Sequence, residues 1–404
     1  MKPITNCRAC GSIRLVEFLD LGKQYLSDFR EDALRPPKYP LVAVFCEYCK
    51  LVQLKHSTPQ VEMYHDRYGF KSGISDSIKA DLNDIVTHAF QYKNDPRKWL
   101  DIASNDGTLL SFVPPDIARV GVDPVPFLCE EAKQHANYII NDYFTSEALD
   151  RHPIVKFAKF DVITSISCFY DMPDPSKFVK DVEAVLADKG IWIIQQNYLL
   201  TTMQLSAVDN FCHEHLEYYT LLSLENLLER FGLEVNEVVT TSINGGSIRT
   251  VVSHRGSFPI DESVERQRRI EFDYEVAIID PYRDFANAAG NQLSHLYNMV
   301  KNLKAQGKII YILAASTRGA TIWQAAEIGP KLVDYAVERN PAKVGKMFSA
   351  IDIPIISESL ARIKKPDYMI VGPWFFADEI IDREKEYLNR GGHLIIPLPE
   401  VTIV

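Results

Sequence analysis

The sequence predicts an α/β protein with two doubly wound parallel sheets, preceded by a small module held by cysteines. A turn of small residues follows a buried strand at residues 99–102, and a second such turn follows the strand at residues 308–314. Beyond each turn, strands alternate with helical segments, which is the pattern of a parallel sheet. Two C-x-x-C pairs lie ahead of both stretches. We therefore expect two Rossmann-like domains and one metal-binding module.

Length and charge limit the classes of function. A chain of 404 residues is expected to form two or three domains. The net charge of −10 argues against a nucleic-acid partner, because phosphate backbones select basic surfaces. No apolar run approaches the ~20 residues that span a bilayer, and the first residues lack the apolar core of a secretory signal. Seven unevenly spaced cysteines do not suggest a secreted disulfide framework. We expect a cytoplasmic monomer without a membrane partner.

The two C-x-x-C pairs predict a zinc-ribbon-like site. Each pair places two thiolates on one tight turn, and two such turns supply four sulfurs for a tetrahedral zinc ion. Because all four ligands are cysteine, no position stays open for catalysis, and the expected role is structural. A redox C-x-x-C and coincidental cysteines are the alternatives. The expected ligands are Cys7, Cys10, Cys46 and Cys49.

The first turn of the central domain is typical of a nucleotide site. Residues 103–107 follow a buried strand and open a helix, and the next strand ends in Asp123. An acid at that place can accept both ribose hydroxyls of an adenosine. Gly107 is the turn's one glycine, so the dinucleotide fingerprint is not matched. Residues 141–143 follow a third strand and are expected to flank the adenine, and a fourth strand covers residues 160–165.

Titratable groups are densest at residues 209–219, after the strand-like run at residues 190–196. Two histidines, two glutamates, a thiol and two phenols within a few positions of one another suit an acid/base site. Two alternatives are that His213 and His215 ligate zinc, or that the groups form a polar network without catalysis. Upstream, the aromatic and hydroxyl residues near Tyr68 and Ser72 suit a loop that covers a ligand, or equally a packed linker.

These motifs resemble those of the sugar C-methyltransferases. The run Leu-Asp-Ile-Ala-Ser-Asn-Asp-Gly-Thr-Leu-Leu at residues 100–110 is similar to that family's E-I-G-S-N-D-G-T-L-L turn, and residues 213–219 match its His-Glu-His segment followed by aromatics. The resemblance covers nearly the whole chain. It implies a zinc-binding domain at 1–70, a class I (Rossmann-like) methyltransferase domain at 71–255, a helical connector at 256–306 and a Rossmann-like domain that binds a sugar nucleotide at 307–404.

The resemblance also implies a chemistry. Members of the family use S-adenosylmethionine to methylate nucleotide-linked 4-keto-6-deoxy sugars, mostly at C3, and the product is a branched sugar for a surface polysaccharide such as an O-antigen, or for a natural product. A hydrogen beside a ketone is acidic only if the enolate is stabilised, so the site needs a base and an oxyanion donor. The family's favoured base corresponds to His215, and Glu214 is expected to hold sugar hydroxyls or orient the base. The nucleotide is expected to be GDP or dTDP.

Two departures from the family pattern point to a different subfamily. Cys212 stands where the family often has a tyrosine, and a thiol cannot replace a phenol as the oxyanion donor. Tyr68, Tyr218 or Tyr219 are the substitutes that the sequence offers. After the fourth strand, Ser167 and Asp171 fall where the family often has an asparagine and a histidine.

The C-terminal part predicts a second sheet beyond two helices at residues 262–306, broken near Pro281. Its strands are expected at residues 308–314, 332–337, 354–356, 368–371 and 393–396. The turn after the first of these strands, at residues 315–320, has free backbone amides and the cation Arg318, which suit a phosphate. The glycine-rich hairpin turn before the strand at residues 248–253 is a further candidate to face the substrate.

The candidate residues fall into three sets besides the metal ligands. The catalytic set is His215, Glu214, Tyr68 and Tyr219. The cofactor set is Ser72, Asp101, Ala103, Asn105, Asp106, Gly107, Asp123, Asn141, Asp142, Tyr143, Ser165 and Ser167. The substrate set is His213, Asn244, Ser316, Thr317, Arg318, Arg339, Asn340 and Trp374. The rival functions are a sugar O- or N-methyltransferase, a catalytically silent protein that binds a sugar nucleotide, and a zinc-dependent hydrolase.

Overall fold

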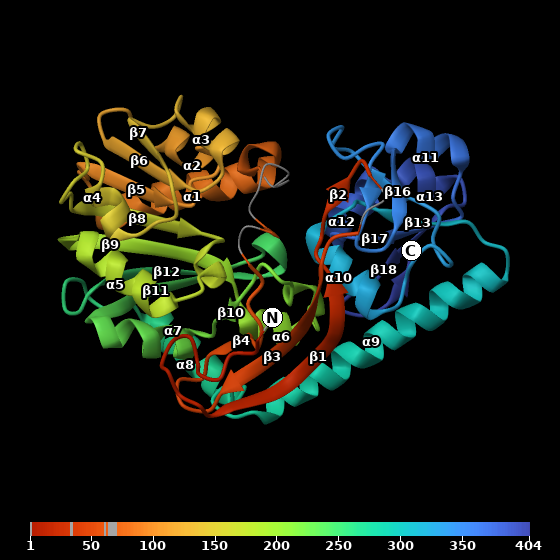
Figure 1. Ribbon diagram of the computed structural model, residues 1–404, viewed down its shortest axis with the longest axis horizontal. Helices are drawn as coiled ribbons and strands as arrows, with labels where there is room; N and C mark the ends of the chain where they lie inside the picture. The colour runs from red at the N-terminus through yellow and green to blue at the C-terminus, as the bar shows by residue number, and fades with distance from the viewer. Residues whose placement is uncertain (1, 33–34, 60–61, 64–70) are drawn as a thin grey trace.

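The computed structural model describes residues 2–32, 35–59, 62–63 and 71–404. Three sheets organise these residues, one of four strands, one of seven and one of eight (Figure 1). The seven-stranded and eight-stranded sheets lie on opposite sides of the molecule, and the N-terminal strands run between them. Tyr68, one of the residues expected in the catalytic set, lies outside the described residues.

The central sheet has the strand order β11-β12-β9-β8-β5-β6-β7. Five of its strands are parallel. The two strands of this sheet that come last in the sequence are antiparallel and lie at one edge. The parallel strands are β5 (Lys98–Ile102), β6 (Ala118–Asp123), β7 (Tyr138–Asn141), β8 (Phe160–Ile166) and β9 (Leu186–Asn197); the antiparallel pair is β11 (Leu233–Thr241) and β12 (Ser247–His254). Strand order reverses beside β5, so the crevice outside the carboxyl ends of β5 and β8 is where ligands bind in such sheets.

Local sequence explains where the helices of this domain begin. They are α1 (Asp76–Tyr92), α2 (Thr108–Phe112), α3 (Pro126–Ala132), α4 (Ser146–Asp150), α5 (Pro175–Val185), α6 (Leu199–Gln204) and α7 (Leu221–Leu228). Asp174 caps α5 by accepting a hydrogen bond from the Lys177 amide at 2.9 Å, and Pro175 fits the first helical position. Gly107 precedes α2 with φ +80°, and a Cβ there would lie 2.9 Å from Ala132 Cα. The turn's one glycine is therefore required by backbone conformation and by its close approach to α3.

The C-terminal sheet has the order β19-β18-β17-β13-β14-β16-β15-β2. Its five parallel strands are β13 (Ile310–Leu313), β14 (Ala336–Glu338), β16 (Ile353–Ser357), β17 (Tyr368–Val371) and β18 (His393–Ile396). The helices of this part are α10 (Thr317–Ala325), α11 (Glu358–Lys364), α12 (Ala377–Arg383) and α13 (Lys385–Asn389). The two-residue strands β15 (Met347–Phe348) and β19 (Thr402–Ile403) extend the sheet, and neither was predicted, because two residues carry no periodicity.

The N-terminal residues contribute to two sheets. Strands β1 (Leu15–Tyr25), β3 (Lys38–Cys46) and β4 (Val52–Leu54) form a four-stranded sheet with β10 (Glu217–Tyr218). Strand β2 (Phe29–Arg30) instead pairs with β15 of the C-terminal sheet. The cysteine module is therefore joined by strand pairing both to the central part and to the C-terminal part. The division of the chain at residues 70, 255 and 306 stays a prediction.

Two helices connect the large sheets, as the charged and periodic sequence predicts. They are α8 (Glu262–Asp273) and α9 (Asp280–Ala305), and Pro281 lies in the first turn of α9. A buried stripe that includes Leu293, Leu296 and Val300 shows that α9 packs along one face, beside the C-terminal sheet (Figure 1). Among the residues described, no helix combines the length and apolar content needed to cross a bilayer.

Candidate active site and metal centre

A pocket opens at the carboxyl ends of β5, β6 and β8, where the strand order predicts a ligand. One wall is apolar and includes Phe144, Met172 and Phe178, as an adenine ring requires. The candidates that line this pocket are Ser72, Ala103, Asn105, Asp123, Asp142, Tyr143 and Ser167. A second pocket shares four of them and continues toward Asp101 and Asn244. The structure thus brings nine residues of the expected sets to one connected site.

The turn after β5 holds this site open by its backbone. Ala103 has φ 58°, Asn105 has φ 51°, and Gly107 follows in the same left-handed region. The side chain of Asn105 accepts a hydrogen bond from the Ser72 amide at 3.0 Å, and Asp106 accepts one from the Gly73 amide at 2.9 Å. The side chains of Asn105 and Asp106 therefore hold residues 72–73 over the turn. Neither Asp106 nor Gly107 lines the two pockets.

Two buried acids lie at the ends of neighbouring strands. Asp123 accepts hydrogen bonds from the Asn105 amide at 2.9 Å and the Val125 amide at 2.8 Å, which aim its carboxylate along the pocket wall. Burial raises the pKa of Asp123. Asp101 accepts a hydrogen bond from Thr164 Oγ1 at 2.7 Å, and burial raises the pKa of this acid to about 7. Asn141 donates to the Asp123 carbonyl at 3.0 Å, so its amide joins β6 to β7.

His215 lies beside the 3₁₀ turn at residues 169–171, against the ring of Tyr170 at a centroid distance of 4.4 Å. Its Nδ1 is 2.9 Å from the Asn210 carbonyl, which can only accept, so Nδ1 carries the proton. The lone pair is then on Nε2. Burial, followed by the charge of Arg318, lowers the pKa of His215 to about 3. The imidazole is neutral at pH 7, and burial raises the pKa of the neighbouring Glu214.

His215 and Glu214 line neither pocket, and three further candidates are held in the packing and line neither pocket as well. His213 is buried and donates from Nε2 to the Tyr39 carbonyl of β3 at 3.2 Å. The ring of Tyr219 stacks on Phe169 at 5.1 Å, in the core. The hydroxyl of Ser165 accepts a hydrogen bond from the Trp192 indole at 3.0 Å. These contacts serve the fold, and the structure does not bring the three side chains to the cofactor pocket.

The candidates of the C-terminal part lie at the carboxyl edge of its parallel strands. Ser316 caps α10 by accepting from the Gly319 amide at 3.1 Å, and Thr317 is the first residue of that helix. Arg339 and Asn340 follow β14, and both their amides donate to Glu338 Oε1. Trp374 is buried in the 3₁₀ turn at residues 374–376. Arg318 points away from this edge, toward the central domain.

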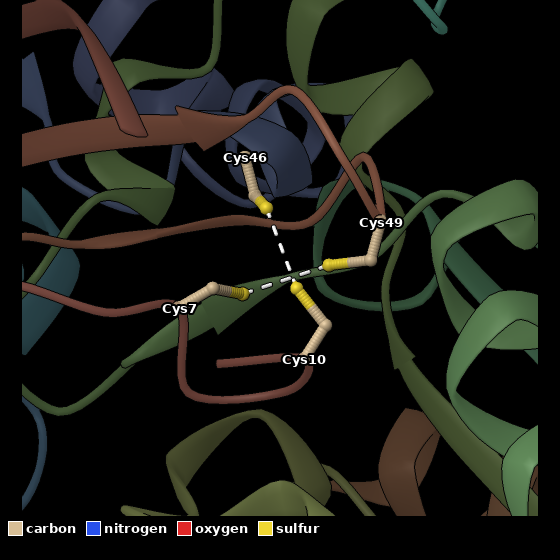
Figure 2. A group of neighbouring side chains, drawn as sticks. All are labelled: Cys7, Cys10, Cys46 and Cys49. Atoms are coloured by element: carbon tan, nitrogen blue, oxygen red, sulfur yellow. Dashed lines mark hydrogen bonds between the residues drawn. The ribbon is translucent and has the colours of Figure 1, made fainter. Parts of the chain in front are cut away.

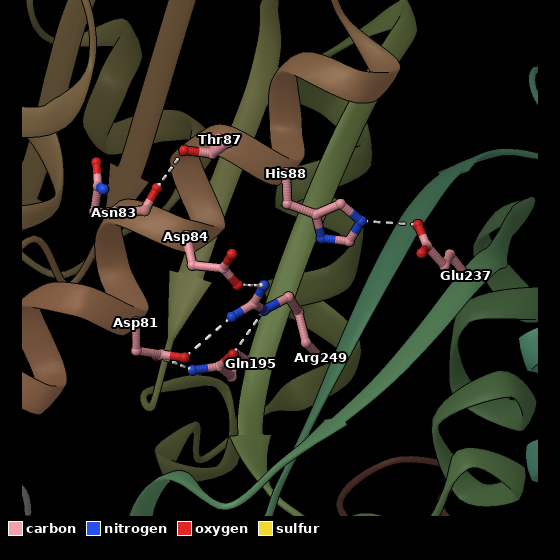
Figure 3. A network of polar contacts seen from close by, with 8 residues as sticks. All are labelled: Asp81, Asn83, Asp84, Thr87, His88, Gln195, Glu237 and Arg249. Atoms are coloured by element: carbon pink, nitrogen blue, oxygen red, sulfur yellow. Dashed lines mark hydrogen bonds and ion pairs between the residues drawn. The ribbon is translucent and has the colours of Figure 1, made fainter.

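An ionic network that no sequence motif marked supports the second pocket (Figure 3). Arg249 of β12 is 2% exposed and pairs with Asp81 at 3.0 Å and with Asp84 at 2.7 Å, both on α1. Its Nε donates to Gln195 of β9 at 2.7 Å, and the Gln195 amide donates to Asp81 at 2.5 Å. Asp81 and Gln195 line the pocket. Since these residues lie far apart in the chain, only folding reveals them as a unit.

The four predicted zinc ligands converge in one cluster (Figure 2). Their sulfurs all lie within 4.8 Å of one another, with Cys7 3.5 Å from Cys49 and Cys10 3.6 Å from Cys46. A tetrahedral ion with Zn–S bonds of about 2.3 Å requires sulfurs about 3.8 Å apart, so the cluster fits zinc. Gln53 donates to Cys7 Sγ at 3.0 Å, as an outer partner of a metal-bound thiolate does. Within the described part of the chain, His213 and His215 belong to no such group.

Three family models match successive parts of the sequence. Residues 7–64 match a domain described as zinc-binding, residues 76–238 match a methyltransferase domain, and residues 242–399 match the C-terminal domain of C-methyltransferases. The order agrees with the cysteine cluster, the cofactor pocket and the second parallel sheet of the structure.

A curated protein and several solved structures are similar to this chain. C-methyltransferase NovU of Streptomyces niveus is 28% identical over an alignment of 424 positions, which spans 100% of this chain and 98% of that protein. A solved S-adenosylmethionine-dependent methyltransferase from Clostridium acetobutylicum ATCC 824 covers 46% of this chain and 94% of its own, with 18% identity and a TM-score of 0.36. The N-methyltransferase NodS from Bradyrhizobium japonicum WM9 covers 45% of this chain and 98% of its own, with 13% identity and a TM-score of 0.35.

The matched domains, the full-length relative and the two sites lead to one assignment. The cofactor is S-adenosylmethionine, and the four cysteines form a zinc-binding centre. The protein is therefore an S-adenosylmethionine-dependent C-methyltransferase whose N-terminal part matches a zinc-binding domain and whose C-terminal part matches the C-terminal domain of C-methyltransferases.

Proposed function

We propose that the enzyme methylates C3 of a nucleotide-linked 4-keto-6-deoxy hexose through an enolate, with His215 as the base. The observation that carries the proposal is the hydrogen bond from His215 Nδ1 to the Asn210 carbonyl, at 2.9 Å. It leaves the Nε2 lone pair available in a buried, neutral imidazole. A neutral base of fixed tautomer is what removal of a proton beside a ketone requires.

The proposed reaction transfers a proton and then a methyl group. Nε2 of His215 takes the proton from C3, and the electron pair of the C–H bond moves into the enolate. S-adenosylmethionine, which the residues that line the pocket beside β5 would hold, would supply an electrophilic methyl group, and its sulfur–methyl bond would break as the C3–methyl bond forms. The imidazolium then returns its proton to water. Glu214, adjacent to the base, is the proposed partner of the sugar hydroxyls.

The nucleotide is assigned to the C-terminal part of the protein. Ser316, Thr317, Arg339, Asn340 and Trp374 lie along the carboxyl edge of a parallel sheet, where nucleotides bind in such folds. GDP and dTDP are the two proposed carriers. We place the enzyme, as a monomer, in the cytoplasm, where a cluster of four thiolates stays reduced, and in the synthesis of branched sugars for a surface polysaccharide or a natural product.

The test offers GDP-linked and dTDP-linked 4-keto-6-deoxy hexoses together with S-adenosylmethionine that carries a ¹³C-methyl group. We expect a new ¹³C-methyl carbon bonded to C3 of one of the two sugars. In D2O with S-adenosylhomocysteine in place of the methyl donor, the C3 hydrogen should exchange for deuterium. A methyl group on oxygen or nitrogen, without exchange at C3, would contradict the proposal.

A further inference from the structure

Arg318 joins the C-terminal domain to the segment that precedes the proposed base. It belongs to α10, and its Nε donates to Asp209 Oδ2 at 2.9 Å while Nη2 lies 2.8 Å from the same oxygen. Asp209 is fully buried. Nη1 donates to the Asn244 carbonyl of the glycine-rich hairpin at 2.5 Å, and the guanidinium lies 4.5 Å from the centre of the Phe375 ring. The side chain predicted to bind a phosphate is thus occupied by protein groups.

The residue after Asp209 supplies the carbonyl that orients His215. The side chain of Asn210 is itself fixed, because Nδ2 donates to Thr202 Oγ1 at 2.7 Å and Oδ1 accepts from Asn197 Nδ2 at 3.1 Å. Arg318 holds the same 3₁₀ turn, at residues 208–210, from the other domain. The position of the carbonyl therefore depends on anchors in both domains.

We propose that Arg318 is a positioning residue for the base: by holding Asp209, it fixes the Asn210 carbonyl that sets the tautomer and direction of His215. The inference rests on the role of His215 in the proposed function. It makes docking of the C-terminal domain a condition for a competent base, because the guanidinium comes from that domain.

The charge of Arg318, like its hydrogen bonds, favours the neutral His215 that the proposed reaction uses. The groups around His215 are Cys212 and Glu214 in its own loop, Tyr170 and Asp171 of the neighbouring 3₁₀ turn and Tyr218 of β10, whose hydroxyl donates to the His215 carbonyl. After burial, Arg318 is the group that lowers the pKa of His215. Loss of the cation should therefore also ease protonation of the imidazole.

A double-mutant cycle of Arg318→Gln and Asp209→Asn tests the inference. If the two residues are coupled, the effects of the single substitutions on the activation free energy do not add in the double variant. For each single variant we expect kcat to fall about 10- to 100-fold, since small misplacements of a catalytic group cost that much. KM for the sugar nucleotide should change by less than about twofold, and the double variant should be no slower than the slower single variant. Arg318→Lys, which keeps one donor and the charge, should recover part of kcat.

Two outcomes would overturn the inference. One is a rise of tenfold or more in KM with kcat unchanged in Arg318→Gln, which would assign the guanidinium to the substrate phosphates. The other is a double variant whose loss is the product of the two single losses. Binding of S-adenosylhomocysteine, whose pocket neither residue lines, should stay within twofold and reports folding in every variant.

A readout without substrate separates this inference from the proposed function. In ¹⁵N-labelled enzyme, NMR should show His215 protonated on Nδ1 alone at pH 7, with a pKa below the usual range of histidine. Arg318→Gln should raise that pKa and mix the two tautomers. An unchanged His215 signal in Arg318→Gln overturns the positioning role, even if the wild-type enzyme proves to methylate a different acceptor.

Discussion

At the scale of single residues, His215 combines a fixed tautomer with a strongly disfavoured charge. An isolated imidazole would be partly protonated near pH 6.5, and in that form it could not accept a proton. Burial and the nearby Arg318 keep the imidazole of His215 unprotonated over the whole physiological pH range. The same low pKa makes His215 a weaker base, and the imidazolium of the proposed reaction would be a strong acid that gives up its proton readily.

Replacing the base gives the most direct residue-scale prediction. His215→Gln should lower the methylation rate by about 10²- to 10⁴-fold, because a positioned general base contributes that much. Affinity for S-adenosylhomocysteine, measured by calorimetry, should stay unchanged. His152→Gln, which alters an exposed histidine, is the matched control and should keep full activity. Deuterium exchange at C3 that survives in His215→Gln would assign the base to another group.

At the scale of elements, strand β10 joins the proposed base to the zinc-binding centre. It begins two residues after His215 and pairs with β4, whose Gln53 donates to Cys7 Sγ. Arg8, between two of the cysteines, donates to the Leu54 carbonyl at 2.6 Å and lies 3.7 Å from the carboxylate of Glu217 in β10. A zinc ion held by the four cysteines would therefore stabilise the sheet on which the segment of the proposed base ends.

Removing a zinc ligand should therefore affect catalysis from a distance. Cys46→Ser is expected to lower bound zinc from about one ion per chain toward none, since one ligand of a closed tetrahedral site is lost. It should also lower the melting temperature and the methylation rate. Metal analysis and thermal unfolding measure these effects. Cys129→Ser removes a buried thiol outside the cluster and should leave the zinc content unchanged. Full activity in a zinc-free Cys46→Ser protein would contradict the link.

At the scale of the whole molecule, buried neutral histidines make the fold sensitive to acid. Burial lowers the pKa of His213 to about 4, and the pKa of His215 is lower still. Below pH 6.5 the unfolded chain binds protons at these positions and the folded chain does not, so the free energy of unfolding falls as the pH falls toward 4.

His213→Gln isolates one of these contributions. Between pH 6.5 and pH 5 each such histidine should cost the wild type about 1.5 kcal/mol of stability, because the slope rises from about 0.7 kcal/mol per pH unit at pH 6.5 toward about 1.4 at pH 5. The variant should lose correspondingly less, as measured by urea unfolding at both pH values. Buried acids with raised pKa, such as Asp101, act with the opposite sign in both proteins, so the difference between the proteins belongs to His213. An equal loss in wild type and variant would refute the assignment.

Several parts of the molecule can be predicted from local patterns in the amino-acid sequence. The cysteine spacing predicted the metal cluster, and the alternation of strands and helices predicted both parallel sheets. The small-residue turn and Asp123 line a pocket, and its use by the cofactor stays a prediction. Each of these signals lies within a few dozen residues, because C-x-x-C turns and strand–turn–helix units form from neighbouring residues.

The tertiary structure alone decided which side chains meet. From the sequence, Arg318 was expected to bind a phosphate and His213 to contact the substrate. In the structure Arg318 binds Asp209, and His213 bonds to the backbone of β3. The network around Arg249 and the pairing of β10 with β4 carried no sequence signal. A buried charge or donor must find a partner, and that partner is chosen by the packing of distant elements, which local periodicity does not encode.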